Sequence, residues 1–256
     1  MEGDPDLVRE ADENFIASFR KLAEHVPEGK TQEDRSVFSF ITGLPLSLFN
    51  GCVVTQEASS AELAASLAWV VAHDVPFSVW IAEKLAAGLA DVPISFGLER
   101  DPSLYPGMVL HPIPQARPQR PGVAVVPISE PRLDEFINVL EEGGLSAELA
   151  QRLISPSFAA DSDVRLFVGR LDGRPVGTSI AIRSRDASGV YNVGTLPVAR
   201  RRGVGSALTW AAVEAGRAWG CDTIVLQSSI MGLSMYSDMG FRTVAPYVAF
   251  AKSSVS

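Results

Sequence analysis

The sequence contains few of the side chains on which many catalytic centres depend. Its 256 residues include three histidines, His25, His73 and His111, all in the first half. The second half therefore has neither a histidine-based triad nor a two-histidine metal site. The only cysteines, Cys52 and Cys221, stand far apart in unlike contexts, and neither belongs to a metal-ligand spacing or a disulfide framework. We expect no metal and a reducing, cytoplasmic compartment.

Long apolar runs and an excess of positive charge are also absent. No segment reaches the roughly 18 to 20 uninterrupted apolar residues that a membrane span requires, and the acidic N-terminus lacks the charge pattern of a signal peptide. The 22 basic residues are outnumbered by 30 acidic ones, and the net charge of -8 argues against a broad surface for nucleic acid. A composition with 46% hydrophobic and 20% charged residues predicts a globular chain with no membrane or nucleic-acid partner.

Proline marks the clearest boundary in the sequence. Four prolines fall within residues 111–121, where they rule out a helix and favour an extended connector. We therefore predict a first domain over residues 1–110, a proline-rich linker over 111–121 and a second domain over 122–256. Both parts have normal domain sizes.

The second part alternates between strand-like and helical patterns. Strands are expected at residues 123–128, 164–171, 175–182, 190–196, 223–226 and 241–250, and helices at 132–142, 147–154, 206–219 and 231–239. Asp172-Gly173 has the composition of a hairpin turn between the second and third of these strands. The three consecutive strands predict an antiparallel meander.

The most informative stretch joins a predicted strand to the predicted helix at 206–219. It consists of Arg200, Arg201, Arg202, Gly203, Val204, Gly205 and Ser206. The two glycines let the backbone approach an anion, the helix N-terminus adds partial positive charge, and the arginines supply full charge. The serine can also cap the helix. This composition suits a diphosphate.

Other interpretations of this stretch are a solvated basic turn and two better-known phosphate loops. A dinucleotide-binding turn needs a third glycine where Leu208 stands and a carboxylate that closes the next strand, whereas Asp222 opens it. A nucleotide-triphosphate loop needs Gly-Lys-Ser or Gly-Lys-Thr, which the stretch lacks. The solvated turn stays open on these residues alone.

The spacing Arg200-x-x-Gly203-x-Gly205, with Pro197 three residues ahead, resembles the cofactor loop of the Gcn5-related N-acetyltransferases, the GNAT superfamily. A second feature of that family lies downstream, where Tyr236 comes shortly before Gly240-Phe241. The element order of residues 122–256 fits as well. The resemblance implies an α/β (α+β) fold with a mixed, mostly antiparallel central sheet flanked by helices, and acetyl-CoA as co-substrate.

The resemblance also implies roles for individual residues. Backbone groups near the end of the strand at 190–196 would bind pantetheine in a cleft where this strand splays from the one beginning at 221. Tyr236 would protonate the leaving thiolate; the alternative is that it packs its helix onto the sheet. The implied cofactor-binding residues are Val193, Thr195, Leu196, Arg200, Arg201, Arg202, Gly203, Val204, Gly205, Ser206 and Ser229. Of these, Ser229 departs from the family's asparagine and is shorter, and no general base can be assigned.

The first half repeats this element order with different residues. Helices at 6–25, 61–73 and 83–89 and strands at 37–41, 52–55, 77–81 and 108–111 parallel the pattern of 190–250, which indicates a diverged duplication. Residues 56–60, at the position of the arginine-glycine stretch, contain no glycine and one glutamate. We expect a tandem form whose first domain is degenerate; an unrelated helical cap is the alternative.

The expected function is that of an acyltransferase which moves an acetyl group from acetyl-CoA to the primary amine of a small molecule by direct attack. The alternatives are a non-catalytic acyl-CoA-binding sensor or interaction module, and a protein N-acetyltransferase. Tyr236 favours an enzyme, whereas Ser229 and the unassigned base favour a binder. A homodimer is compatible with either function.

Overall fold

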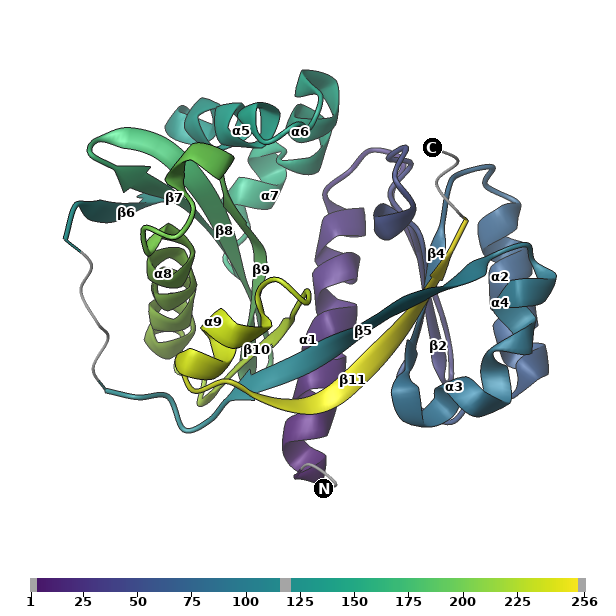
Figure 1. Ribbon diagram of the computed structural model, residues 1–256. Helices are drawn as coiled ribbons and strands as arrows, with labels where there is room; N and C mark the ends of the chain where they lie inside the picture. The colour runs from purple at the N-terminus through teal and green to yellow at the C-terminus, as the bar shows by residue number, and fades with distance from the viewer. Residues whose placement is uncertain (1–3, 116–120, 253–256) are drawn as a thin grey trace.

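The strands of the protein form one continuous sheet (Figure 1). The computed structural model describes residues 4–115 and 121–252, and in this part of the chain the strand order is β1-β2-β3-β4-β11-β5-β10-β9-β8-β7-β6. The strands are β1 Lys30–Asp34, β2 Val37–Ile41, β3 Gly51–Val54, β4 Ser78–Ala82, β5 Glu99–Leu110, β6 Val123–Ile128, β7 Val164–Leu171, β8 Arg174–Ser184, β9 Ala187–Thr195, β10 Thr223–Gln227 and β11 Arg242–Ala251. Only the pairs β3–β4 and β9–β10 are parallel among these strands, so the sheet is mixed and mostly antiparallel, as expected.

Helices cover both faces of this sheet. They are α1 Pro5–Glu24, α2 Ser60–Val71, α3 Glu83–Leu89, α4 Asp91–Ser95, α5 Leu133–Glu142, α6 Ala147–Leu153, α7 Pro156–Ala160, α8 Val204–Ala218 and α9 Leu233–Asp238. Val225 of β10 packs against α1, whereas its neighbours Ile224 and Leu226 share a core with α8. Because successive side chains of a strand point to opposite faces, α1 and α8 lie on opposite sides of the sheet.

The two halves of the chain exchange strands. The succession β3-α2-β4-α3-α4-β5 in the first half matches β9-α8-β10-α9-β11 in the second, including the parallel pair in each. The last strand of each half crosses over, so β5 pairs with β10 and β11 pairs with β4, while β5 and β11 pair antiparallel in the middle (Figure 1). Neither half has a complete sheet by itself. The domain limits at 110 and 122 stay a prediction, and residues 116–120 of the expected linker lie outside the described residues.

The first half differs most from the expected elements. The strand β1 is polar and lies at the sheet edge, so its side chains show no apolar alternation. The strand β5 begins at Glu99 rather than at residue 108 and includes Pro102 and Pro106. Up to Pro106 it pairs only with β11, and a strand with one free edge tolerates residues that lack an N–H donor. The short helices α4 and α7 were also not expected.

Two further findings concern the cysteines and the possibility of a membrane-spanning helix. Cys52 and Cys221 are both free and buried. Of the helices in the described part of the chain, none is long and apolar enough to cross a membrane.

Candidate functional site

The parallel strands β9 and β10 separate partway along their length. Their pairing runs from Thr223 opposite Ala187 to Val225 opposite Gly189. Beyond this last pair β9 continues to Thr195 and stays paired only with β8 on its other side. The sheet therefore opens between β9 and the end of β10, which agrees with the splay implied by the resemblance.

A bulge places backbone groups of β9 in this opening. The register between β8 and β9 shifts so that Asn192 and Val193 together face Ser179, and Asn192 has a left-handed backbone with φ 50°. The Thr178 hydroxyl donates a hydrogen bond to the Asn192 carbonyl at 3.2 Å, which fixes the bulge. Because a bulged residue leaves the ladder, Val193 lies where a ligand in the opening would meet its backbone.

The other two expected backbone contacts are partly engaged within the protein. The Leu196 N–H donates to the Val176 carbonyl at 2.8 Å, and the Leu196 carbonyl accepts from Ala199 N–H at 2.9 Å. The Thr195 carbonyl accepts from Arg200 Nε at 3.3 Å. The Leu196 N–H therefore has no free hydrogen for a ligand, which removes it as a donor to pantetheine.

The arginine-glycine stretch forms the turn into α8. Arg201 and Gly203 both have left-handed backbones, with φ 59° and 81°, and the helix begins at Val204 without a side-chain cap. The first amide that bonds within the helix ladder is Ala207 N–H, which donates to Gly203 at 3.0 Å. The amides of Val204 to Ser206 are thus the free donors of this helix end, where the helix dipole also favours an anion.

The three arginines immediately precede this helix end and are exposed. Arg202 forms an ion pair with Asp172 at 3.0 Å, and both side chains are more than half exposed. Such a surface pair contributes on the order of 0 to 1 kcal/mol and can be exchanged for a ligand. No hydrogen bond or ion pair engages Arg201 among the described residues, so its guanidinium is available to an anion.

Gly205 keeps space open at the junction of the loop with the opening. A Cβ at this position would lie 3.3 Å from Met235 Sδ on α9 and 3.7 Å from Thr195 Oγ1 at the end of β9. The first turn of α8 therefore meets both α9 and β9 here. A side chain at residue 205 would occupy the place where the loop and the opening join.

Tyr236 lies on α9 and is 8% exposed, with its ring edge-on to Phe241 at 5.8 Å between centroids. Burial raises the pKa of the Tyr236 phenol to about 12, and a hydrogen bond with the Thr209 hydroxyl acts in the opposite direction. At neutral pH the phenol is therefore a hydrogen-bond donor. Its ring also packs over Gly232, where a Cβ would lie 2.8 Å from it, so the tyrosine has a packing role as well.

Ser229 lies in the turn between β10 and α9. Its hydroxyl accepts from Gly232 N–H at 3.3 Å, and its carbonyl accepts from the Ser228 hydroxyl at 2.7 Å. These bonds give Ser229 a function in shaping the turn. Nothing in them favours or excludes a contact with a cofactor.

Gln227 was not expected as a site residue, yet it ends β10 at the opening. Its side-chain nitrogen is buried and has no hydrogen-bond partner among the described residues. The available signal in the sequence was a side-chain amide directly after the apolar run 224–226. Only the register between β9 and β10 shows that this strand ends at the opening.

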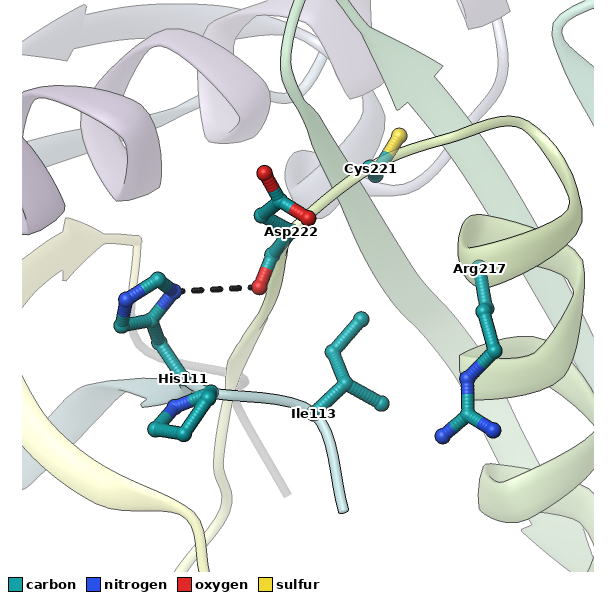
Figure 2. A pocket seen from close by; sticks show the side chains of 6 residues that line it. His111, Ile113, Arg217, Cys221 and Asp222 are labelled. Atoms are coloured by element: carbon teal, nitrogen blue, oxygen red, sulfur yellow. Dashed lines mark hydrogen bonds between the residues drawn. The ribbon is translucent and has the colours of Figure 1, made fainter. Parts of the chain in front are cut away.

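A pocket elsewhere on the molecule does not belong to this site. It is lined by His111, Pro112, Ile113, Arg217, Cys221 and Asp222, and His111 Nδ1 lies 3.1 Å from the Asp222 carbonyl oxygen (Figure 2). Arg217 is near the C-terminus of the 15-residue helix α8, whereas the arginine-glycine turn precedes its N-terminus. At about 1.5 Å per residue the two ends lie roughly 20 Å apart.

Comparisons with known proteins agree with this fold. Residues 144–228 match the family described as the acetyltransferase (GNAT) domain. A GCN5-related N-acetyltransferase from Kribbella flavida shares the fold at 19% identity with a TM-score of 0.66, covering 96% of this chain and 95% of that one. No curated protein matches the sequence.

Two further solved structures share the fold. A conserved protein of unknown function from Staphylococcus epidermidis has 14% identity and a TM-score of 0.61 over 87% of this chain and 93% of that one. A GNAT-family protein from Novosphingobium aromaticivorans has 15% identity and a TM-score of 0.54 over 94% and 97%. Residues 144–228 of this chain therefore match the acetyltransferase (GNAT) domain, and the chain shares the fold of these solved structures over most of its length.

Proposed function

We propose that this protein transfers the acetyl group of acetyl-CoA to the primary amine of a small molecule. The observation that carries the proposal is the uncapped N-terminus of α8, preceded by three exposed arginines and set beside the opening between β9 and β10. A diphosphate fits the free amides and arginines, and an extended pantetheine arm fits the opening. No cluster of metal-ligating side chains occurs in the described part of the chain, and the reaction requires none.

The backbone of Val193 at the bulge and the phenol of Tyr236 would stabilise negative charge at different steps of the reaction. As the amine attacks the thioester carbonyl, a C–N bond forms, the C–S bond breaks, and negative charge develops first on the carbonyl oxygen and then on sulfur. The Val193 N–H is the candidate donor to that oxygen. Tyr236 would donate to sulfur, and since its pKa of about 12 lies roughly 3 units above that of an ordinary thiol, we expect a hydrogen bond to the thiolate before any full proton transfer.

A second candidate function is binding of acyl-CoA without turnover. Two observations favour it: the Leu196 N–H is already engaged, and Ser229 is occupied in its own turn. Both reduce the number of groups that can hold pantetheine in a reactive position.

Calorimetry with acetyl-CoA, followed by free-thiol release with a panel of amines, separates these functions. Binding that is accompanied by thiol release, with an acetylated amine identified by mass spectrometry, is the result we expect. Binding with no thiol release on any amine would favour the binding module. Absence of binding would defeat both.

A further inference from the structure

The face of α1 that lies against the sheet carries buried polar side chains. Asp12 is 8% exposed and Asn14 is fully buried. The Tyr247 hydroxyl of β11 donates to Asp12 Oδ1 at 2.6 Å, and the Tyr191 hydroxyl of β9 donates to Asn14 Oδ1 at 2.7 Å. We give the name α1 cluster to the group formed by Asp12, Asn14, Tyr191, Tyr247 and Gln227.

The strand register places the α1 cluster at the apex of the opening between β9 and β10. Gly189 and Val225 form the last pair, and both face α1, because a Cβ at Gly189 would lie 2.0 Å from Asn14 Oδ1 and Val225 packs against residues of α1. Two residues further along each strand, Tyr191 and Gln227 face the same side. They therefore flank the opening on the α1 face.

Tyr247 brings Asp12 to the same place. Gly107 of β5 pairs with Gln227, and a Cβ at Gly107 would lie 2.6 Å from Tyr247 Cε2. The tyrosine ring thus lies over Gly107, beside Gln227, and its hydroxyl reaches Asp12. The carboxylate of the first half is held next to the opening of the second half.

Two polar groups of the α1 cluster have unused hydrogen-bonding capacity. Among the described residues the buried Gln227 Nε2 has no hydrogen-bond partner and Asp12 has one hydrogen bond, although an ionised carboxylate can accept about four. No cation forms an ion pair with Asp12 in the part of the chain that the structure describes. A buried carboxylate that forms no ion pair is costly, so this site favours a cationic ligand.

We propose that Asp12 binds the ammonium group of the acceptor amine on the α1 face of the opening and accepts a proton from it, with Tyr247 as a positioning residue and Gln227 as a hydrogen-bond donor to the acceptor. This proposal rests on the proposed function. The acceptor would be an alkyl amine, which is cationic at neutral pH. It would enter from the side opposite to α8 and Tyr236.

The reaction releases one proton from the ammonium, and Asp12 is placed to accept it. The ammonium loses one proton to Asp12, which later releases it to solvent, and the neutral amine then forms the C–N bond as the C–S bond breaks. The second proton lost by nitrogen balances the one that the thiolate takes up. No oxidant, reductant or metal enters the step.

The titration of Asp12 gives the proposal a measurable signature. Burial raises the pKa of Asp12 to about 6, the hydrogen bond from Tyr247 and the charge of Lys84 on α3 lower it, and Glu13 on α1 raises it. An ordinary aspartate titrates near 3.9. Since only the ionised form accepts a proton, we expect kcat/KM for an alkyl amine to rise with pH through about 6.

The experiment compares Asp12→Asn with wild type on an alkyl amine and on an arylamine, which is uncharged at neutral pH. We expect kcat/KM to fall by about 100-fold or more on the alkyl amine and by less than about threefold on the arylamine, where no ammonium must be bound or deprotonated. Affinity for acetyl-CoA, measured by calorimetry, should not change. Glu13→Gln is the matched control, because it removes the neighbouring carboxylate of α1 and should leave both rates unchanged well above pH 6, where Asp12 is ionised with or without Glu13.

A second variant keeps the test decisive if Asp12→Asn does not fold. Tyr247→Phe removes the hydrogen bond that lowers the pKa of Asp12, so the acidic limb of the pH profile should move to higher pH. An unshifted limb, or an Asp12→Asn enzyme equally impaired on both amines, would overturn the role of Asp12. If wild type binds acetyl-CoA but acetylates no amine, the proposed function fails instead, which calorimetry and thiol release show separately.

Discussion

The N-termini of α2 and α8 occupy equivalent places in the two halves but differ in chemistry. In α2, the Ser59 hydroxyl accepts from Glu62 N–H at 3.2 Å, and the Glu62 carboxylate accepts from Ser59 N–H at 2.7 Å. This capping box satisfies the helix end with the protein's own groups and adds negative charge. In α8 no side chain caps the helix, and arginines precede it. One helix end is closed to anions and the other is open.

The parallel strands beside these helices differ in the same way. In the first half β3 and β4 stay paired from Gly51 opposite Ser78 to Val54 opposite Ile81, the whole length of β3. In the second half β9 continues for six residues beyond its last pair with β10, over residues 190–195. The two halves therefore share a packing plan, while the opening and the uncapped helix end with its arginines occur together in the second half.

The largest effect is expected at the open helix end. Gly203→Asp places a negative charge at the helix N-terminus and a side chain at φ 81°, so acetyl-CoA affinity measured by calorimetry should fall by about 100-fold or more. Gly173→Asp is the matched control, since its φ of 84° gives the same backbone strain at a hairpin turn with no atom within 4 Å of an added Cβ. Affinity that survives Gly203→Asp would show that the cofactor lies elsewhere.

A smaller effect is expected from Tyr236→Phe. Loss of the hydroxyl should lower kcat by about 10- to 100-fold in steady-state kinetics, because the developing thiolate loses its donor. The buried ring and its contact with Phe241 remain, so affinity for acetyl-CoA should stay within about twofold. Full activity at neutral pH would leave Tyr236 with the packing role alone and solvent as the acid.

The smallest effect is expected at the closed helix end. Ser59→Ala removes the capping box and should lower the free energy of unfolding by about 1 kcal/mol in a denaturant titration. Acetyl-CoA should bind with a stoichiometry of one per chain in both wild type and variant, because Glu57 and Glu62 add negative charge at this helix end. A stoichiometry near two would make the first half a working site.

Elements with strong local patterns were predictable from the sequence. The helix Glu83–Leu89 and the strand Val164–Leu171 match their expected bounds, because their apolar spacing and flanking turn residues are local signals. The strand β1 and the first part of β5 were not predictable from the sequence. A polar edge strand and a proline-containing strand form because of their pairing with other strands. Local propensity does not encode those partners.

The sequence by itself determined that a glycine- and arginine-rich turn leads into α8, because these residues and the helix start lie within seven neighbouring positions. Only the tertiary structure decided that the Leu196 N–H is engaged, that β5 and β11 exchange between halves, and that Asp12 meets Tyr247 across 235 residues of sequence. Contacts of this kind depend on how α1 and the strands pack against one another. A hydrogen bond between distant residues leaves no periodic signal in either segment, so the polar residues of α1 looked like an ordinary amphipathic helix until the sheet placed them at the opening.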